Sequence, residues 1–159
     1  MKCLECRGRM QTRRENVRYD ASGLKGITLV GVEVSRCLDC GKAEIAIPRI
    51  EQLHRLIAKT LIEKHARLTP AEIVFLRKSL GWSGVDFARH MGTRQETVTR
   101  WERGSIRMGA TADRLLRMMV ASKTPIADYS VDTLGEIADS APPSVLKLKA
   151  SADTWQVAA

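Results

Sequence analysis

The stretch Ser83–Gly104, SGVDFARHMGTRQETVTRWERG, carries the pattern that decides the fold of the chain. Ala88 is small, which suits a position where two helices cross closely, and Gly92 permits a sharp turn because it has no Cβ. Thr93 follows this turn, where its hydroxyl can cap the next helix. The pattern therefore predicts two short helices joined by a tight turn.

The second of these helices is predicted to have an apolar face and a polar face. Val98 and Trp101 lie three residues apart, which places both on the side that faces the core. The polar residues then project outward, as in a helix that reads base edges in the major groove of DNA. The residues predicted to contact bases are Arg94, Gln95, Glu96, Thr97, Thr99 and Arg100, and those predicted to hold phosphates are Lys78, Ser83, Arg89, Arg103 and Arg107. A solvated surface helix is the alternative interpretation, since any amphipathic helix shows a polar stripe.

Helical spacing continues on both sides of this stretch. Thr69-Pro70 is a start signal, because Thr can cap a helix and Pro suits its first position. Helices are predicted at 70–80, 83–91, 94–103 and 112–122, and together they form an all-α domain over residues 68–124. A further helix, apolar on one side, is predicted within residues 49–67 and connects this domain to the N-terminal part of the chain.

All four cysteines of the chain stand in two CxxC pairs, Cys3–Cys6 and Cys37–Cys40, each followed closely by a glycine at Gly8 or Gly41. Two such turns brought together give tetrahedral coordination of Zn²⁺ by four sulfurs at ~2.3 Å. Four thiolates leave no open coordination position, so we predict one structural Zn²⁺ per chain, bound by Cys3, Cys6, Cys37 and Cys40. A redox-active CxxC and coincidentally buried cysteines are the alternatives.

Residues 1–48 are predicted to form a small β-rich zinc-binding module around these cysteines. The run Ile27–Val34 alternates and is rich in β-branched residues, which is typical of a strand. The predicted fold class is therefore α+β: a four-cysteine zinc module joined by a helix to an all-α domain. Residues 125–159 are a C-terminal tail of unknown role, for which disorder is the simplest expectation, although a helix at 131–139 and a strand at 145–149 fit its pattern.

The charge of the chain is uneven. Its 26 Lys and Arg exceed its 18 Asp and Glu, and most of the excess lies in residues 51–124, which favours a polyanionic partner there. A solvated basic face would give the same balance. No apolar run approaches the ~18 residues of a membrane helix, and no signal peptide follows Met1. We therefore expect a cytoplasmic protein without membrane contact, whose paired cysteines bind metal rather than form disulfides.

Residues from Leu68 to about Met119 resemble the Xre/Cro-type helix-turn-helix, whose recognition helix reads T-x-x-x-[IV]-x-x-[WY]-E-x-G; here it has one more residue before the Val. Together with the CxxC pairs, the chain resembles more specifically the MqsA (YgiT-type) antitoxin family. That resemblance implies one zinc held by the four cysteines, a zinc domain that engages an RNA-cleaving toxin, and dimerisation through the helix-turn-helix domain. The family's base-reading Asn and Arg fall at Glu96 and Arg100, and Gly84 stands where Xre-type proteins often have a phosphate-binding Gln.

These features predict a sequence-specific DNA-binding transcriptional repressor, the antitoxin of a type II toxin-antitoxin pair that neutralises an RNase toxin and represses its own operon. We expect it to bind a palindromic double-stranded DNA operator as a homodimer. The toxin is expected to bind within residues 1–65, along the Ile27–Val34 strand by edge pairing. A stand-alone Xre-type transcriptional regulator with a structural zinc module is the alternative. An enzyme is a third class, but the sequence offers no paired carboxylates or nucleophile with a base, so no catalytic residue is predicted.

Overall fold

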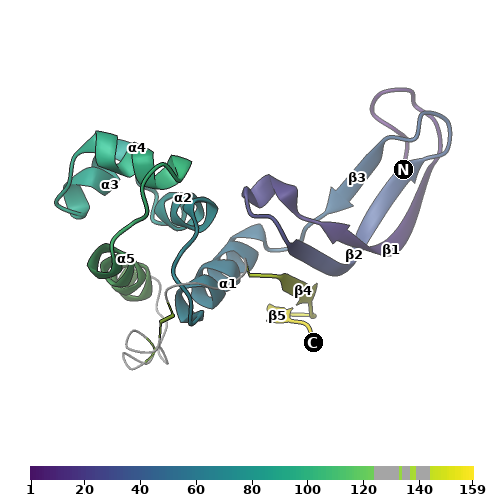
Figure 1. Cartoon of the computed structure of the whole chain (residues 1–159). Coiled ribbons are helices and arrows are strands. Elements are labelled where there is room, and N and C mark those ends of the chain that lie inside the picture. Colours follow the sequence, from purple (N-terminus) through teal and green to yellow (C-terminus); the bar gives the residue numbers. More distant parts are fainter. Residues whose placement is uncertain (124–132, 134–136, 139–143) are drawn as a thin grey trace. The chain divides into compact units, whose positions relative to one another are not determined.

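The computed structural model describes residues 1–123, 133, 137–138 and 144–159, which fall into two compact units (Figure 1). The sheet unit comprises Met1–Asp20, Gly26–Leu53 and Val145–Ala159. The helical unit comprises Ala21–Lys25 and His54–Ser144. The α+β fold class is confirmed, because the clustered cysteines belong to a β-sheet and the helices follow it along the chain.

The sheet unit is built around one long strand, β2 (Ile27–Cys37). β1 (Met10–Arg18) and β3 (Ala43–Ala46) pair with β2 in antiparallel orientation. β4 (Leu146–Ala150) pairs with β2 in parallel, and β5 (Trp155–Val157) pairs with β4. The strand order is β1-β2-β4-β5, with β3 also on β2. β2 is therefore an interior strand of the sheet.

A β-bulge at Gly31 changes which residues of β2 are buried. Ile27 and Leu29 are buried before the bulge and Val32 and Val34 after it, so the alternation shifts by one residue. Gly31 has a φ of 65°, which glycine adopts without strain. The β1 register shifts at the same point. The strand predicted at Ile27–Val34 is present and continues to Cys37.

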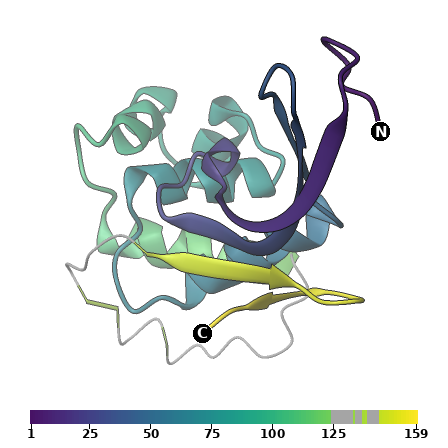
Figure 2. The same cartoon turned by 90° about the vertical axis from the view of Figure 1, so that its right-hand side faces the viewer.

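The C-terminal residues return to this sheet, and β4 lies beside β2 in Figure 2. Leu146 and Leu148 on β4 and Trp155 on β5 are buried, and the indole N–H of Trp155 donates to the Pro48 carbonyl at 2.8 Å. The disorder expected for the tail is wrong for residues 144–159, because alternating apolar residues give this segment a face to bury. The strand expected at 145–149 is observed at 146–150, and the helix expected at 131–139 lies for the most part outside the described residues.

The helical unit contains α1 (Ile50–Glu63) from His54 onward. Among the described residues it contains four further helices. These are α2 (Pro70–Ser79), α3 (Gly84–His90), α4 (Gln95–Arg103) and α5 (Ala110–Lys123). Each helix contributes apolar side chains that are almost completely buried, such as Leu61, Leu76, Phe87, Val98 and Leu116. The four helices predicted between residues 70 and 122 are present, with bounds that differ from the prediction by no more than two residues.

Short-range hydrogen bonds set the starts of these helices. Thr69 caps α2 and Ser83 caps α3, each in a capping box with the acidic residue three positions later. α4 has no side-chain cap, and its N-cap residue is Arg94. The cap predicted at Thr93 is wrong, because Thr93 lies one residue before the N-cap and belongs to the preceding turn, where its N–H donates to the Ala88 carbonyl at 2.9 Å. α4 therefore begins one residue later than predicted.

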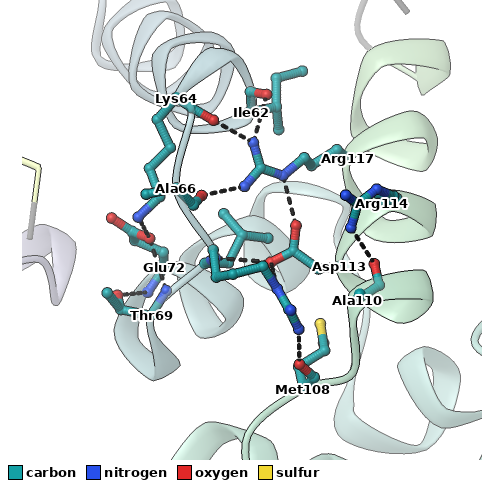
Figure 3. Close-up of polar contacts among 12 residues, drawn as sticks. Ile62, Lys64, Ala66, Thr69, Glu72, Met108, Ala110, Asp113, Arg114 and Arg117 are labelled. Atoms are coloured by element: carbon teal, nitrogen blue, oxygen red, sulfur yellow. Dashed lines mark hydrogen bonds and ion pairs between the residues drawn. The ribbon is translucent and has the colours of Figure 1, made fainter. Parts of the chain in front are cut away.

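A fully buried arginine ties α5 to the segment at the end of α1 (Figure 3). The Nε of Arg117 donates to Asp113 Oδ1 at 2.7 Å. Its Nη1 donates to the carbonyls of Ile62 and Lys64 at 3.1 and 2.6 Å, and its Nη2 donates to the carbonyl of Ala66 at 2.5 Å. Burial of a guanidinium is tolerated only when its donors are paired in this way. The polar network therefore fixes the connecting segment against α5.

Candidate metal centre and nucleic-acid interface

The four cysteines converge at one end of the sheet unit. Their sulfurs all lie within 4.8 Å of one another. The Cys3 and Cys40 sulfurs are 3.7 Å apart and those of Cys6 and Cys37 are 3.3 Å apart. A tetrahedral site with Zn–S bonds of ~2.3 Å requires sulfur–sulfur distances of about 3.8 Å. The four residues therefore fit a single metal ion, and four thiolates are the donor set typical of structural zinc.

The two CxxC segments form equivalent turns. The Arg7 N–H donates to the Cys3 carbonyl at 2.9 Å, and the Gly41 N–H donates to the Cys37 carbonyl at 3.1 Å. Gly41 has a φ of 72°, a backbone conformation that this turn needs and that glycine adopts without strain. Gly8 has a different role, because a Cβ there would lie 2.0 Å from the Asp39 carboxylate of the other turn. A larger residue at position 8 would therefore displace the exposed Asp39 side chain from its place beside the first turn.

The thiols of this cluster differ in pKa. A hydrogen bond from the backbone N–H of Cys40, assisted by that of Asp39, lowers the pKa of Cys37 to about 7. The Gly8 N–H lowers the pKa of Cys6, but hydrogen bonds with the thiols of Cys37 and Cys40 outweigh it and raise that pKa to about 12. Four neighbouring sulfurs do not all ionise together without a cation, whereas a divalent metal ion favours four thiolates. The cluster is thus suited to hold a metal ion.

α4 buries its apolar residues and exposes most of its polar ones. Val98 and Trp101 are buried, as their spacing predicts. The residues predicted to contact bases all lie on α4 or at its N-cap: Arg94, Gln95, Glu96 and Arg100 are exposed, and Thr97 and Thr99 are half-buried. Thr99 is engaged within the helix, since its hydroxyl donates to the Gln95 carbonyl at 3.1 Å. The side chains of Arg94 and Arg100 have no hydrogen-bond or ion-pair partner among the described residues. They are thus available to a ligand outside the protein.

Contacts that the sequence pattern did not reveal hold α4 in place. The rings of Phe87 and Trp101 meet edge to face with centroids 6.3 Å apart. The Arg77 guanidinium of α2 pairs with the Glu102 carboxylate, with Nη2 and Oε2 3.3 Å apart, and its Nη1 donates to the Trp82 carbonyl at 2.9 Å. Glu102 belongs to the quoted stretch, but its partner lies 25 residues earlier in the chain. This pair fixes α4 relative to α2 and to the start of α3.

The residues predicted to hold phosphates differ in whether their side chains already have a hydrogen-bond or ion-pair partner within the protein. Lys78, Arg103 and Arg107 are exposed and have no side-chain partner among the described residues. Arg89 is exposed but lies 3.6 Å from Asp86. The Ser83 hydroxyl donates to Asp86 Oδ2 at 2.7 Å, and this bond, together with one from the Ser83 N–H, lowers the pKa of Asp86. A carboxylate therefore already occupies the N-terminus of α3.

Residues 75–126 match the protein-family model described as Helix-turn-helix. This range contains α3 and α4, the two helices of the quoted stretch. The helical unit therefore carries an Xre-type helix-turn-helix, the domain of a class of DNA-binding regulators. A comparison with curated proteins gives no match. Within the described part of the chain, no helix combines the length and the apolar character needed to cross a membrane.

Proposed function

We propose that the protein is a sequence-specific transcriptional repressor that reads a palindromic operator with α4. The exposed and unpartnered Arg100, on a helix whose opposite face is locked by Val98 and Trp101, carries this proposal. Arg pairs bidentately with guanine O6 and N7, which gives one strong base preference. Lys78, Arg103 and Arg107 supply phosphate contacts around it. Arg89 and Ser83 are the weaker phosphate candidates, since Asp86 engages both.

A homodimer is part of this proposal, because one recognition helix buries too little surface for tight specific binding. Leu115 and Met118 lie three residues apart on α5 and are 39% and 38% exposed, which gives the helical unit an apolar strip for a second copy. Two-fold symmetry places the half-sites about one helical turn, ~34 Å, apart. Operator footprints of the full chain measure that spacing.

Arg100→Ala is expected to weaken operator binding by about 1–3 kcal/mol and to relax the preference at one base position in each half-site.

Lys78→Ala is expected to weaken binding to all DNA sequences, since it removes only a phosphate contact. It should also reduce the slope of the logarithm of the binding constant against the logarithm of salt concentration by about one unit. Binding titrations across base variants and salt concentrations measure both effects. Arg18→Ala on β1, which removes an equal charge from the sheet unit, is the control and should leave affinity unchanged. Unaltered base preference in Arg100→Ala would exclude α4 as the reading helix.

We further propose that the chain is an antitoxin whose sheet unit binds an RNase toxin. The combination of a four-cysteine sheet unit with a DNA-binding unit supports this function. The edge pairing expected along Ile27–Val34 is wrong, because β4 pairs with residues 27–30 of β2 and β3 with residues 33–36. Among the described residues, β1 pairs with no strand other than β2. The Met10 N–H at its start donates to the Met1 carbonyl, and the rest of this edge is open for an added strand. We place the toxin there.

Co-expression of the full chain with the product of the neighbouring reading frame is expected to give a stable complex without RNase activity. Hydrogen exchange should then slow at amides of β1, because an added strand protects the open edge. The β5 amides, at the far end of the strand order, are the internal control. Absence of a complex would favour the alternative function, a stand-alone regulator with a structural zinc module.

A further inference from the structure

A break in the pairing of β2 leaves a cavity in the sheet unit. β4 pairs with β2 up to Val30, and β3 pairs with it from Glu33 onward. Gly31 and Val32 therefore have no partner strand on this side of β2. Between the ends of β3 and β4 lies a cavity of about 620 Å³, within the size range of small-molecule sites. The lining of this cavity includes none of the four cysteines and none of the residues that we propose for DNA binding.

Arg49 lines this cavity and is held there in an unusual backbone conformation. Its φ is 47°, in the left-handed region that residues with a Cβ rarely adopt. Its Nη2 donates to the Ser151 carbonyl at 2.7 Å, which orients the guanidinium. Its Nε is buried and has no hydrogen-bond partner among the described residues. The backbone conformation and the bond to Ser151 thus hold the guanidinium at the wall of the cavity, with Nε turned away from solvent.

The charges around the cavity leave Arg49 without an anionic partner. Glu33 also lines the cavity, but it lies 4.0 Å from Arg14, and both of these side chains are largely exposed. No carboxylate of the described residues lies within ion-pair distance of Arg49. The site thus has one uncompensated positive charge, next to walls that include Ile47, Pro48 and Ala150.

We propose that this cavity binds a carboxylate attached to a compact apolar group. The Nη1 group of Arg49 and the second N–H of Nη2 would receive the carboxylate, because Nε is buried and Nη2 already donates one N–H to Ser151. The apolar walls would receive the rest of the ligand. A dianionic phosphate fits less well, because Arg14, the other arginine of the lining, is already paired with Glu33, which leaves one free positive charge among the described lining residues. The carboxylate belongs either to a free small acid or to the C-terminus of a partner polypeptide, and this site is independent of the DNA-binding proposal.

Two-dimensional NMR titration of the full-length protein tests this proposal with four probes: 3-methylbutanoate, its amide, the tripeptide Ala-Ala-Val and its C-terminal amide. We expect saturable shifts at the amides of Gly31 and Ser151 with at least one carboxylate, and about tenfold weaker binding of its amide. Binding of 3-methylbutanoate alone identifies a small acid as the ligand, and binding of the tripeptide alone identifies a polypeptide terminus.

Variants separate the site from general effects on folding. Arg49→Gly removes the guanidinium while relieving the backbone strain, so the fold is retained and binding should fall by about tenfold or more. Ala46→Phe should block the cavity with Arg49 still present, since Ala46 is an exposed lining residue. Arg18→Gln, at an exposed arginine outside the cavity, is the matched control and should bind normally. No saturable shift up to about 10 mM, equal binding of acid and amide, or unchanged binding in both Arg49→Gly and Ala46→Phe would overturn the proposal.

Discussion

Cys37→Ser is expected to abolish metal binding and to unfold the cysteine end of the sheet unit, while α2–α5 remain folded. Structural zinc sites contribute apparent binding free energies of about 10–16 kcal/mol, which equals or exceeds the whole stability of a small domain, about 5–15 kcal/mol. At this end of the sheet the buried cluster consists only of Cys3, Met10 and Cys37. Little apolar burial remains to hold the two turns once a ligand is lost.

Metal analysis should give about one zinc per chain for the native protein and none for Cys37→Ser. Amide NMR spectra should lose dispersion for residues before β1 and around β3 and keep it for the helical unit. Leu38→Ser is the matched control, because Leu38 is 61% exposed in the same turn and its replacement leaves all four sulfurs in place. A metal-free native protein with a fully folded cysteine end would refute the structural role of zinc.

Arg117→Ala is expected to lower the free energy of unfolding of the helical unit by about 3–5 kcal/mol. The substitution leaves the buried Asp113 carboxylate without its closest cation and removes the donor to the carbonyls of Ile62, Lys64 and Ala66. Uncompensated buried polar groups carry their full desolvation cost. The urea midpoint, monitored by far-ultraviolet circular dichroism, measures the loss.

Arg114→Ala on the same helix is the control for this substitution. Arg114 is half-buried rather than fully buried, and its Nη1 donates to the Ala110 carbonyl at 3.2 Å within its own helix, so its replacement should cost clearly less than that of Arg117. Replacing both Arg117 by Met and Asp113 by Leu should recover little of the stability, because the Leu68 N–H and the largely buried Arg67 side chain also lose the Asp113 carboxylate. If Arg117→Ala and Arg114→Ala lower the free energy of unfolding equally, the hydrogen bonds of Arg117 drawn in Figure 3 add no net stability.

The helical unit was predictable because its signals are local. Capping residues such as Thr69 and Ser83 act on amides three positions away, and the spacing of Val98 and Trp101 defines the buried face of α4 within one turn. The cysteine cluster was predictable for a related reason, since each CxxC turn is local. The two turns together contain all four cysteines of the chain. Thr93 shows the limit, because the sequence offered a capping hydroxyl there, whereas α4 starts one residue later with Arg94 at its N-cap.

The partners of each element were decided by the tertiary structure. Leu146 and Leu148 predict a strand, but nothing near them in sequence specifies that β4 pairs with β2, because this choice depends on surface buried from distant segments. The burial of Arg117 likewise depends on carbonyls more than 50 residues away. The sequence alone determined the helices, the α4 stripe and the two cysteine turns, because the interactions that form them act over a few residues. Only the tertiary structure decided the open edge of β1, the cavity at Arg49 and the anchoring of α5, since these arise where distant chain segments meet.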